Sequence, residues 1–101
     1  MPILAIFSGP GIHKDDYEAL RREIGWEHHH PHGGIFHAAS FDDAGDAHVV
    51  DVWESQEALD AFVGTHLAPT MQKLQIPPPQ VAVYPLHNLN VYPAIERFML
   101  R

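Results

Sequence analysis

The chain has 101 residues and a mass of 11.4 kDa, which fits one small domain with a thin hydrophobic core. Six basic residues against thirteen acidic ones give a formal charge of −7, and Lys and Arg form no cluster, which argues against a nucleic-acid partner. No apolar run approaches the roughly 20 residues of a membrane span, and the lack of cysteine excludes disulfides and thiolate metal sites and favours the cytoplasm.

The first third of the chain predicts a strand, a helix and a loop. Residues 2–7 are apolar and predict a strand, which the following Gly and Pro residues end. Residues 15–24 carry apolar side chains at helical spacing, and Gly25 suits a left-handed cap after that helix. The segment 26–34, WEHHHPHGG, has no periodicity and predicts a loop rich in histidine.

Residues 35–42 and 47–54 predict the two strands of a hairpin. The loop between them ends in Gly45, which suits a type I turn closed by a bulge with this glycine in the left-handed conformation. That register makes three cross-strand pairs, Ala39 with Val49, His37 with Asp51, and Ile35 with Trp53. Because side chains alternate, one face then carries Ile35, His37, Ala39, Phe41, Val49, Asp51 and Trp53. Both faces are largely apolar, so we expect helices to cover one and a second subunit to cover the other.

The second half of the chain predicts a helix, a strand and a tail. Ser55 is a good N-cap for a helix, and Pro69 is expected to start a new short helical turn. An apolar stripe on this helix comprises Leu59, Phe62, Val63, His66 and Leu67. Residues 80–86 predict the last strand, in which Pro85 marks a bulge or an edge. The tail from residue 91 predicts a final helix or an arm that docks on a neighbour.

The order β-α-β-β-α-β predicts a ferredoxin-like α+β fold, a four-stranded antiparallel sheet with helices on one face. The segment Val49–Ser55 (VVDVWES), followed by Glu57-Ala58-Leu59 and by Phe62, resembles the dimeric α+β barrel superfamily, which includes antibiotic-biosynthesis monooxygenase-like proteins. The start of the second strand, GIFH at 34–37, is also similar to small members of this group. The resemblance covers residues 1–87, which we expect to form the domain, with 88–101 as a C-terminal tail or arm.

The predicted pocket lies between the sheet and the helices. A carboxylate beside an imidazole fixes the imidazole tautomer and suits a general base, as His37 and Asp51 would provide. We expect the catalytic residues to be His37, Asp51 and His66, and the ligand-binding residues to be Trp53, Phe41 and Phe62. The resemblance implies a homodimer or tetramer that binds a small apolar or aromatic molecule. It also implies oxygenation of a small aromatic or polyketide-like substrate.

Other interpretations stay open. In a non-catalytic ligand-binding or assembly protein, His37 and Asp51 would be a satisfied polar pair within the core. The loop histidines are weak candidate metal ligands, because neighbouring loop residues rarely converge on one ion: His28, His29, His30 and His32. A haem-degrading variant would use His66 as iron ligand, but Ser8 stands where the resemblance implies Asn. We therefore expect no cofactor, with metal and haem left open.

Overall fold

The elements follow the predicted order in the computed structural model, which describes residues 1–100; Arg101 of the predicted tail lies outside the described residues. The first half contains β1 (Ile3–Gly9), α1 (Lys14–Ile24), β2 (Gly34–Phe41) and β3 (Ala47–Trp53). The second half contains α2 (Gln56–Phe62), the π-helical turn η1 (Val63–Leu67), α3 (Ala68–Lys73), β4 (Gln80–Pro85) and the 3₁₀ helix η2 (Pro93–Phe98).

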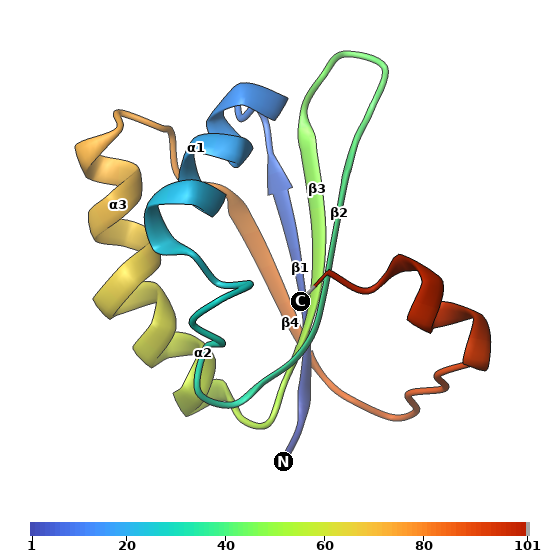
Figure 1. Cartoon of the computed structure of the whole chain (residues 1–101). Coiled ribbons are helices and arrows are strands. Elements are labelled where there is room, and N and C mark those ends of the chain that lie inside the picture. Colours follow the sequence, from blue (N-terminus) through green and yellow to red (C-terminus); the bar gives the residue numbers. More distant parts are fainter. Residues whose placement is uncertain (101) are drawn as a thin grey trace.

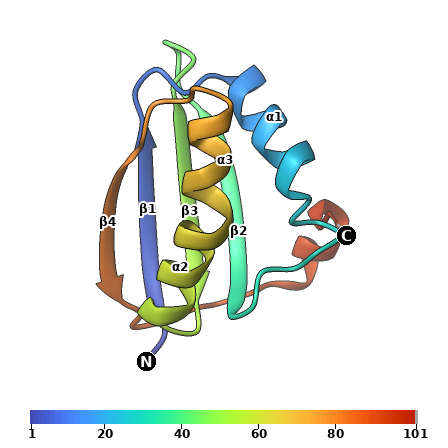
Figure 2. The same cartoon turned by 90° about the vertical axis from the view of Figure 1, so that its left-hand side faces the viewer.

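The sheet has the strand order β2-β3-β1-β4, and every neighbouring pair is antiparallel. The helices α1, α2 and α3 cover one face, and the tail lies on the opposite side of the sheet (Figure 1). Figure 2 shows the helical side, with α2 and α3 crossing in front of the strands. The ferredoxin-like prediction is confirmed, and Pro85 lies on an edge strand, where a missing N–H is tolerated.

Local signals explain where the helices begin and end. Gly25 has φ 69° and donates its N–H to the carbonyl of Arg21, which confirms the predicted C-terminal cap of α1. The Ser55 hydroxyl accepts the N–H of Ala58 at 3.1 Å, which confirms the N-cap of α2. The prediction that Pro69 starts a new short helical turn agrees with α3, which has this proline in its first turn, although α2, η1 and α3 follow one another without a break.

The wider turn η1 accounts for this continuity. The N–H of Ala68 bonds to the carbonyl of Val63, five residues back, so the helix is expanded just before Pro69. Pro69 then lies in the first turn of α3, where a missing N–H costs little. The stripe that the sequence predicts as continuous is broken at this turn, and His66 is exposed while Leu59 is 3% exposed.

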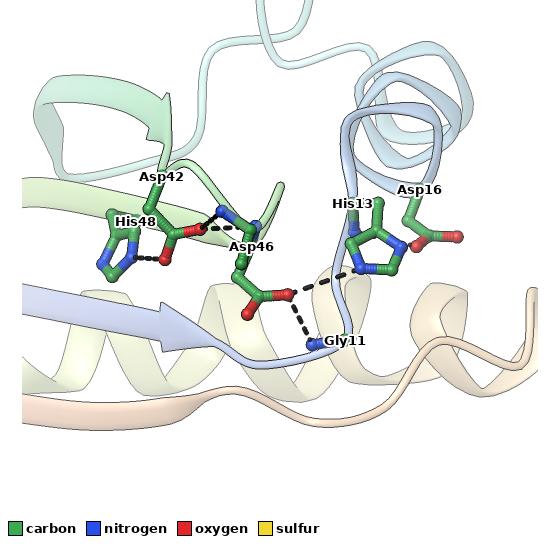
Figure 3. A network of polar contacts seen from close by, with 7 residues as sticks. Gly11, His13, Asp16, Asp42, Asp46 and His48 are labelled. Atoms are coloured by element: carbon green, nitrogen blue, oxygen red, sulfur yellow. Dashed lines mark hydrogen bonds and ion pairs between the residues drawn. The ribbon is translucent and has the colours of Figure 1, made fainter.

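The hairpin turn forms as predicted and is tied to the neighbouring loop. The N–H of Asp42 bonds to the carbonyl of Asp46 at 3.0 Å, and Gly45 has φ 87°. The Asp42 carboxylate also accepts the N–H groups of Ala44 and Asp46 and a ring N–H of His48 (Figure 3). The Asp46 carboxylate accepts the N–H of Gly11 at 3.0 Å, which joins the hairpin to the loop between β1 and α1.

This turn sets the pairing of β2 with β3. His37 pairs with Asp51, and Ala39 with Val49, as predicted. The predicted pairing of Ile35 with Trp53 is wrong, because Gly34 lies opposite Trp53 and a bulge follows it. Ile35 is therefore 46% exposed and does not belong to the covered face.

The core between sheet and helices has two halves. One half packs β1 and β3 against α2 and contains Ile3, Ala5, Phe7, Trp53 and Leu59. The other half packs the opposite end of the sheet against α1 and α3 and contains Ile12, Leu20, Ala47, Met71 and Ile76. Asp51 is the buried charged residue of the described chain, and it lies on the covered face of β3 beside the first half.

Candidate functional site

A chain of side-chain hydrogen bonds crosses the covered face of the sheet. The Tyr17 hydroxyl on α1 lies 2.7 Å from Nε2 of His37 on β2. Nδ1 of the same imidazole lies 2.6 Å from Oδ1 of Asp51 on β3. The indole N–H of Trp53 donates to Oδ2 of Asp51 at 3.1 Å. The predicted neighbours His37 and Asp51 are thus in direct contact, and each Asp51 oxygen has a partner.

The partners fix the positions of the protons. An ionised Asp51 only accepts, so Nδ1 of His37 must carry the proton that it shares with Oδ1. The neutral imidazole then has its lone pair on Nε2, where the Tyr17 hydroxyl donates. A tautomer held by a carboxylate in this way presents one basic nitrogen in a fixed direction.

The residues of this chain of hydrogen bonds differ in how deeply they are buried. Asp51 is 6% exposed, whereas 36% of the His37 side chain is exposed, so a small molecule can reach the imidazole but not the carboxylate. Burial raises the pKa of Tyr17 to about 12, so its hydroxyl stays protonated and remains a donor at neutral pH. The ring of Trp26 lies 5.3 Å from the ring of His37 and tilted against it.

The predicted ligand-binding aromatics lie at different depths. Phe41 meets the ring of Tyr17 edge-on at 5.8 Å. Trp53 is 3% exposed, and its ring lies 5.3 Å from that of Phe62, so these two rings pack against each other within the core. The aromatic rings beside His37 are those of Tyr17 and Trp26.

The structure places His66 in a different environment from the other predicted catalytic residues. Its ring lies 5.8 Å from that of Phe62. It lines a cleft of about 300 Å³ between the histidine-rich loop and α2–η1. Neither this cleft nor the second cavity, which runs along α1 beside Arg21 and Glu27, is lined by His37 or Asp51.

The loop histidines are divided between the two cavities. His28 lines the cavity beside Arg21, while His29, His30 and His32 line the cleft with His66. Within residues 1–100, no group of three or more His, Cys, Asp or Glu side chains is arranged to hold a metal ion. The structure thus places His66, from outside the loop, in the same cleft as three loop histidines, but it shows no preformed metal centre among the described residues.

Two residues of the site were not predicted from the sequence. Tyr17 falls on the apolar face of the first predicted helix, and Trp26 falls in a segment without periodicity. The spacing of the apolar residues indicates that Tyr17 faces the sheet, but it does not indicate which strand residue its hydroxyl meets. Local patterns therefore contain no signal for the contact between Tyr17 and His37.

Comparison with known proteins identifies the fold that carries this geometry. No protein-family model matches the sequence, and no curated protein matches it. A conserved protein from Methanosarcina mazei Go1 superposes with a TM-score of 0.63 at 12% identity, over 83% of this chain and 91% of that chain. SnoaB, a cofactor-independent oxygenase from Streptomyces nogalater, superposes with a TM-score of 0.59 at 13% identity, over 87% of this chain and 93% of that chain.

A candidate antibiotic biosynthesis monooxygenase from Deinococcus radiodurans superposes with a TM-score of 0.58 at 16% identity, over 91% of this chain and 99% of that chain. The chain has the fold of the dimeric α+β barrels. At these low sequence identities, the likeness shows a shared fold and not a shared activity. Within the part of this chain that the structure describes, no helix has the length and apolar character of a membrane span.

Proposed function

We propose that this protein is a homodimeric small-molecule-binding barrel that oxygenates a small acidic aromatic compound without a cofactor, with His37 as the base. The observation that carries this proposal is the contact of 2.6 Å between Nδ1 of His37 and Asp51, which leaves Nε2 as the basic nitrogen of a fixed and partly exposed imidazole, with the Tyr17 hydroxyl 2.7 Å from it. SnoaB, which has the same fold and is described as a cofactor-independent oxygenase, supports the reaction class.

The proposed chemistry begins with proton transfer. Nε2 of His37 takes a proton from an acidic carbon of the substrate, either directly or through the Tyr17 hydroxyl that lies 2.7 Å away. The electron-rich anion then reduces O₂. One oxygen atom bonds to the substrate carbon, and the other leaves as water with the two hydrogens that this carbon carried. Asp51 stabilises the imidazolium while His37 holds the proton.

The outer face of the sheet supports the proposed second subunit. On this face Ile6 lies opposite Val50, and the two side chains are 38% and 37% exposed. Tyr84, on the same face, is 55% exposed. The tail lies on this side (Figure 1), and Val52 is 2% exposed, but the centre of the face remains open. A second copy placed here would bury these apolar side chains, and the tail 88–101 is proposed as an arm beside that interface.

The test is oxygen uptake with anthrone, whose acidic CH₂ group ionises to an aromatic anion. We expect the wild-type protein to accelerate uptake, and His37→Gln and Asp51→Asn to lower the rate by about a hundredfold or more. His48→Gln is the matched control, because His48 also pairs with an aspartate but lies at the hairpin turn. Its rate should remain that of the wild type.

Two outcomes would reject the proposal. If the folded His37→Gln variant keeps the wild-type rate, His37 is not the base. If the wild-type protein does not accelerate uptake with anthrone or with related acidic phenols, the non-catalytic alternative is favoured. In that alternative, the Tyr17–His37–Asp51 chain is a satisfied polar element of the core.

A further inference from the structure

The cleft between the histidine-rich loop and α2–η1 is separate from the hydrogen-bonded chain around His37. It has a volume of about 300 Å³, at the lower end of the range for small-molecule sites. Its apolar lining comes from both sides, the loop and the end of α1 on one side and α2 on the other: Ile24, Pro31, Ala58, Ala61 and Phe62. Such a lining suits a flat apolar body of one or two rings.

The loop side of the cleft is held in place by backbone contacts. The N–H groups of His28 and His29 bond to the carbonyl of Gly25, and the N–H of Gly34 bonds to that of Pro31. The carbonyl of Gly33 accepts the N–H of Glu54, which lies between β3 and α2. The loop therefore closes one side of a cleft that exists before a ligand arrives.

An ion pair anchors the start of the loop to α1. The Arg21 guanidinium donates two hydrogen bonds of 2.6 Å to the carboxylate of Glu27. The bonds from Arg21 hold the pKa of Glu27 below its ordinary value, so this carboxylate stays charged at neutral pH. This ion pair holds the Glu27 carboxylate against α1, and Glu27 does not line the cleft.

The polar part of the lining consists of imidazoles and one hydroxyl, that of Thr65. Four imidazoles line the cleft, three from the loop and one from η1: His29, His30, His32 and His66. Among the described residues, none of these four rings forms a hydrogen bond or an ion pair with another side chain. No carboxylate lines the cleft, although the chain has thirteen acidic residues against six basic ones.

This composition selects the charge of the ligand. A neutral imidazole donates one N–H, and a protonated imidazole donates two and carries positive charge, so each state can bind a carboxylate. A cationic ligand would find no carboxylate in the lining. The turn η1 is also the irregular part of its helix, and π-helical turns frequently occur at functional sites.

We propose that this histidine cleft binds a small aromatic carboxylate. The ring of the ligand packs on Phe62 between Ile24 and Pro31, and its carboxylate accepts N–H groups from His66 and the loop histidines. This site does not depend on catalysis by His37, so a failure of the oxygenation test leaves it intact. Phe62 also packs on Trp53, whose N–H donates to Asp51, so an occupied cleft adjoins the wall of the proposed catalytic site.

The test is calorimetric titration with 2-naphthoate, with 2-naphthamide as a neutral ligand of similar shape. We expect naphthoate to bind with a Kd of about 1 mM or lower and the amide to bind about tenfold or more weakly. His66→Gln should weaken naphthoate binding about tenfold. His87→Gln is the matched control, because His87 is exposed and is not part of the cleft lining. If His66→Gln does not fold, His32→Gln replaces it.

Three results would overturn the proposal. Equal affinity for naphthoate and naphthamide would show that the imidazoles do not recognise the carboxylate. Unchanged binding to folded His66→Gln and His32→Gln would place the ligand elsewhere. Loss of binding in the presence of EDTA would show that a bound metal, not the histidines themselves, holds the carboxylate. Binding that survives EDTA and is weakened by His66→Gln supports direct recognition.

Discussion

At the scale of single residues, the site depends on one imidazole held at both ring nitrogens, by the Tyr17 hydroxyl as donor and by the Asp51 carboxylate as acceptor. The pairing of His37 with Asp51 could be predicted, because the turn at Gly45 fixes the register and alternation then places both side chains on one face. The contact with Tyr17 could not be predicted, because it depends on the height and angle at which α1 lies on the sheet. Sequence spacing specifies the face of a helix but not these two quantities.

Tyr17 gives a prediction at alkaline pH. Burial raises its pKa to about 12, above the ordinary value of 10.0. At pH values between these two pKa values, the Tyr17 hydroxyl keeps its proton in the folded protein and loses it in the unfolded chain. The unfolded state then binds fewer protons, so the free energy of unfolding falls as pH rises through this window. The loss is at most about 3 kcal/mol, from two units at about 1.4 kcal/mol each.

Absorbance at 295 nm measures this titration directly. We expect the folded protein to show a phenolate component with a midpoint near pH 12, and Tyr17→Phe to lack it. Urea unfolding at pH 9 and at pH 11 should show a smaller decrease in stability for the variant than for the wild-type protein. A wild-type titration without a late component would contradict the burial of this hydroxyl.

At the scale of elements, the order of strands and helices was predictable, but the irregular segments were not. The β-bulge after Gly34 and the π-helical turn η1 each add one residue to a regular pattern, and such an addition changes the direction of the side chains at the irregular segment. Ile35 and His66 are the two residues whose predicted surroundings are wrong for this reason. Both irregularities adjoin the histidine-rich loop, so the errors fall beside the cleft.

Gly33 is the point at which this loop touches α2, and its substitution tests that contact. Gly33 has φ 82°, and a Cβ there would lie 2.6 Å from Cβ of Ala58. Gly33→Ala should therefore lower the free energy of unfolding by about 2 kcal/mol or more, from backbone strain and from this clash. Thermal unfolding would show a decrease in Tm of roughly 10 °C.

Gly64 provides the matched control, because the same change there meets no atom within 4 Å. Gly64→Ala should raise the free energy of unfolding by about 0.5–1 kcal/mol, since alanine restricts the unfolded chain and favours a helix. Equal effects of the two substitutions would mean that the loop is not seated on α2 and that the cleft has no fixed wall.

At the scale of the whole molecule, the two faces of the sheet differ in how completely they are covered. The helices cover the face that carries Ala5 (0% exposed) and Phe7 (8% exposed), whereas Ile6, between them in the chain, remains 38% exposed on the other face. A sheet with two apolar faces needs cover on both, and in this chain the tail supplies only part of the second cover (Figure 1). In the proposed assembly, the second copy therefore covers the apolar side chains of the outer face that the tail leaves exposed.

Val50 tests this assembly, because it lies opposite Ile6 at the open centre of the outer face. We expect light scattering coupled to gel filtration to give twice the mass of 11.4 kDa for the wild-type protein. Val50→Glu should shift the protein to a monomer at micromolar concentration, because dimerisation would bury an unpaired carboxylate. Val81→Glu is the control: Val81 is 49% exposed on the edge strand β4, and its side chain lies on the helical face. A folded wild-type monomer would contradict the assembly, and dissociation by both variants would mean that the interface extends beyond the outer face.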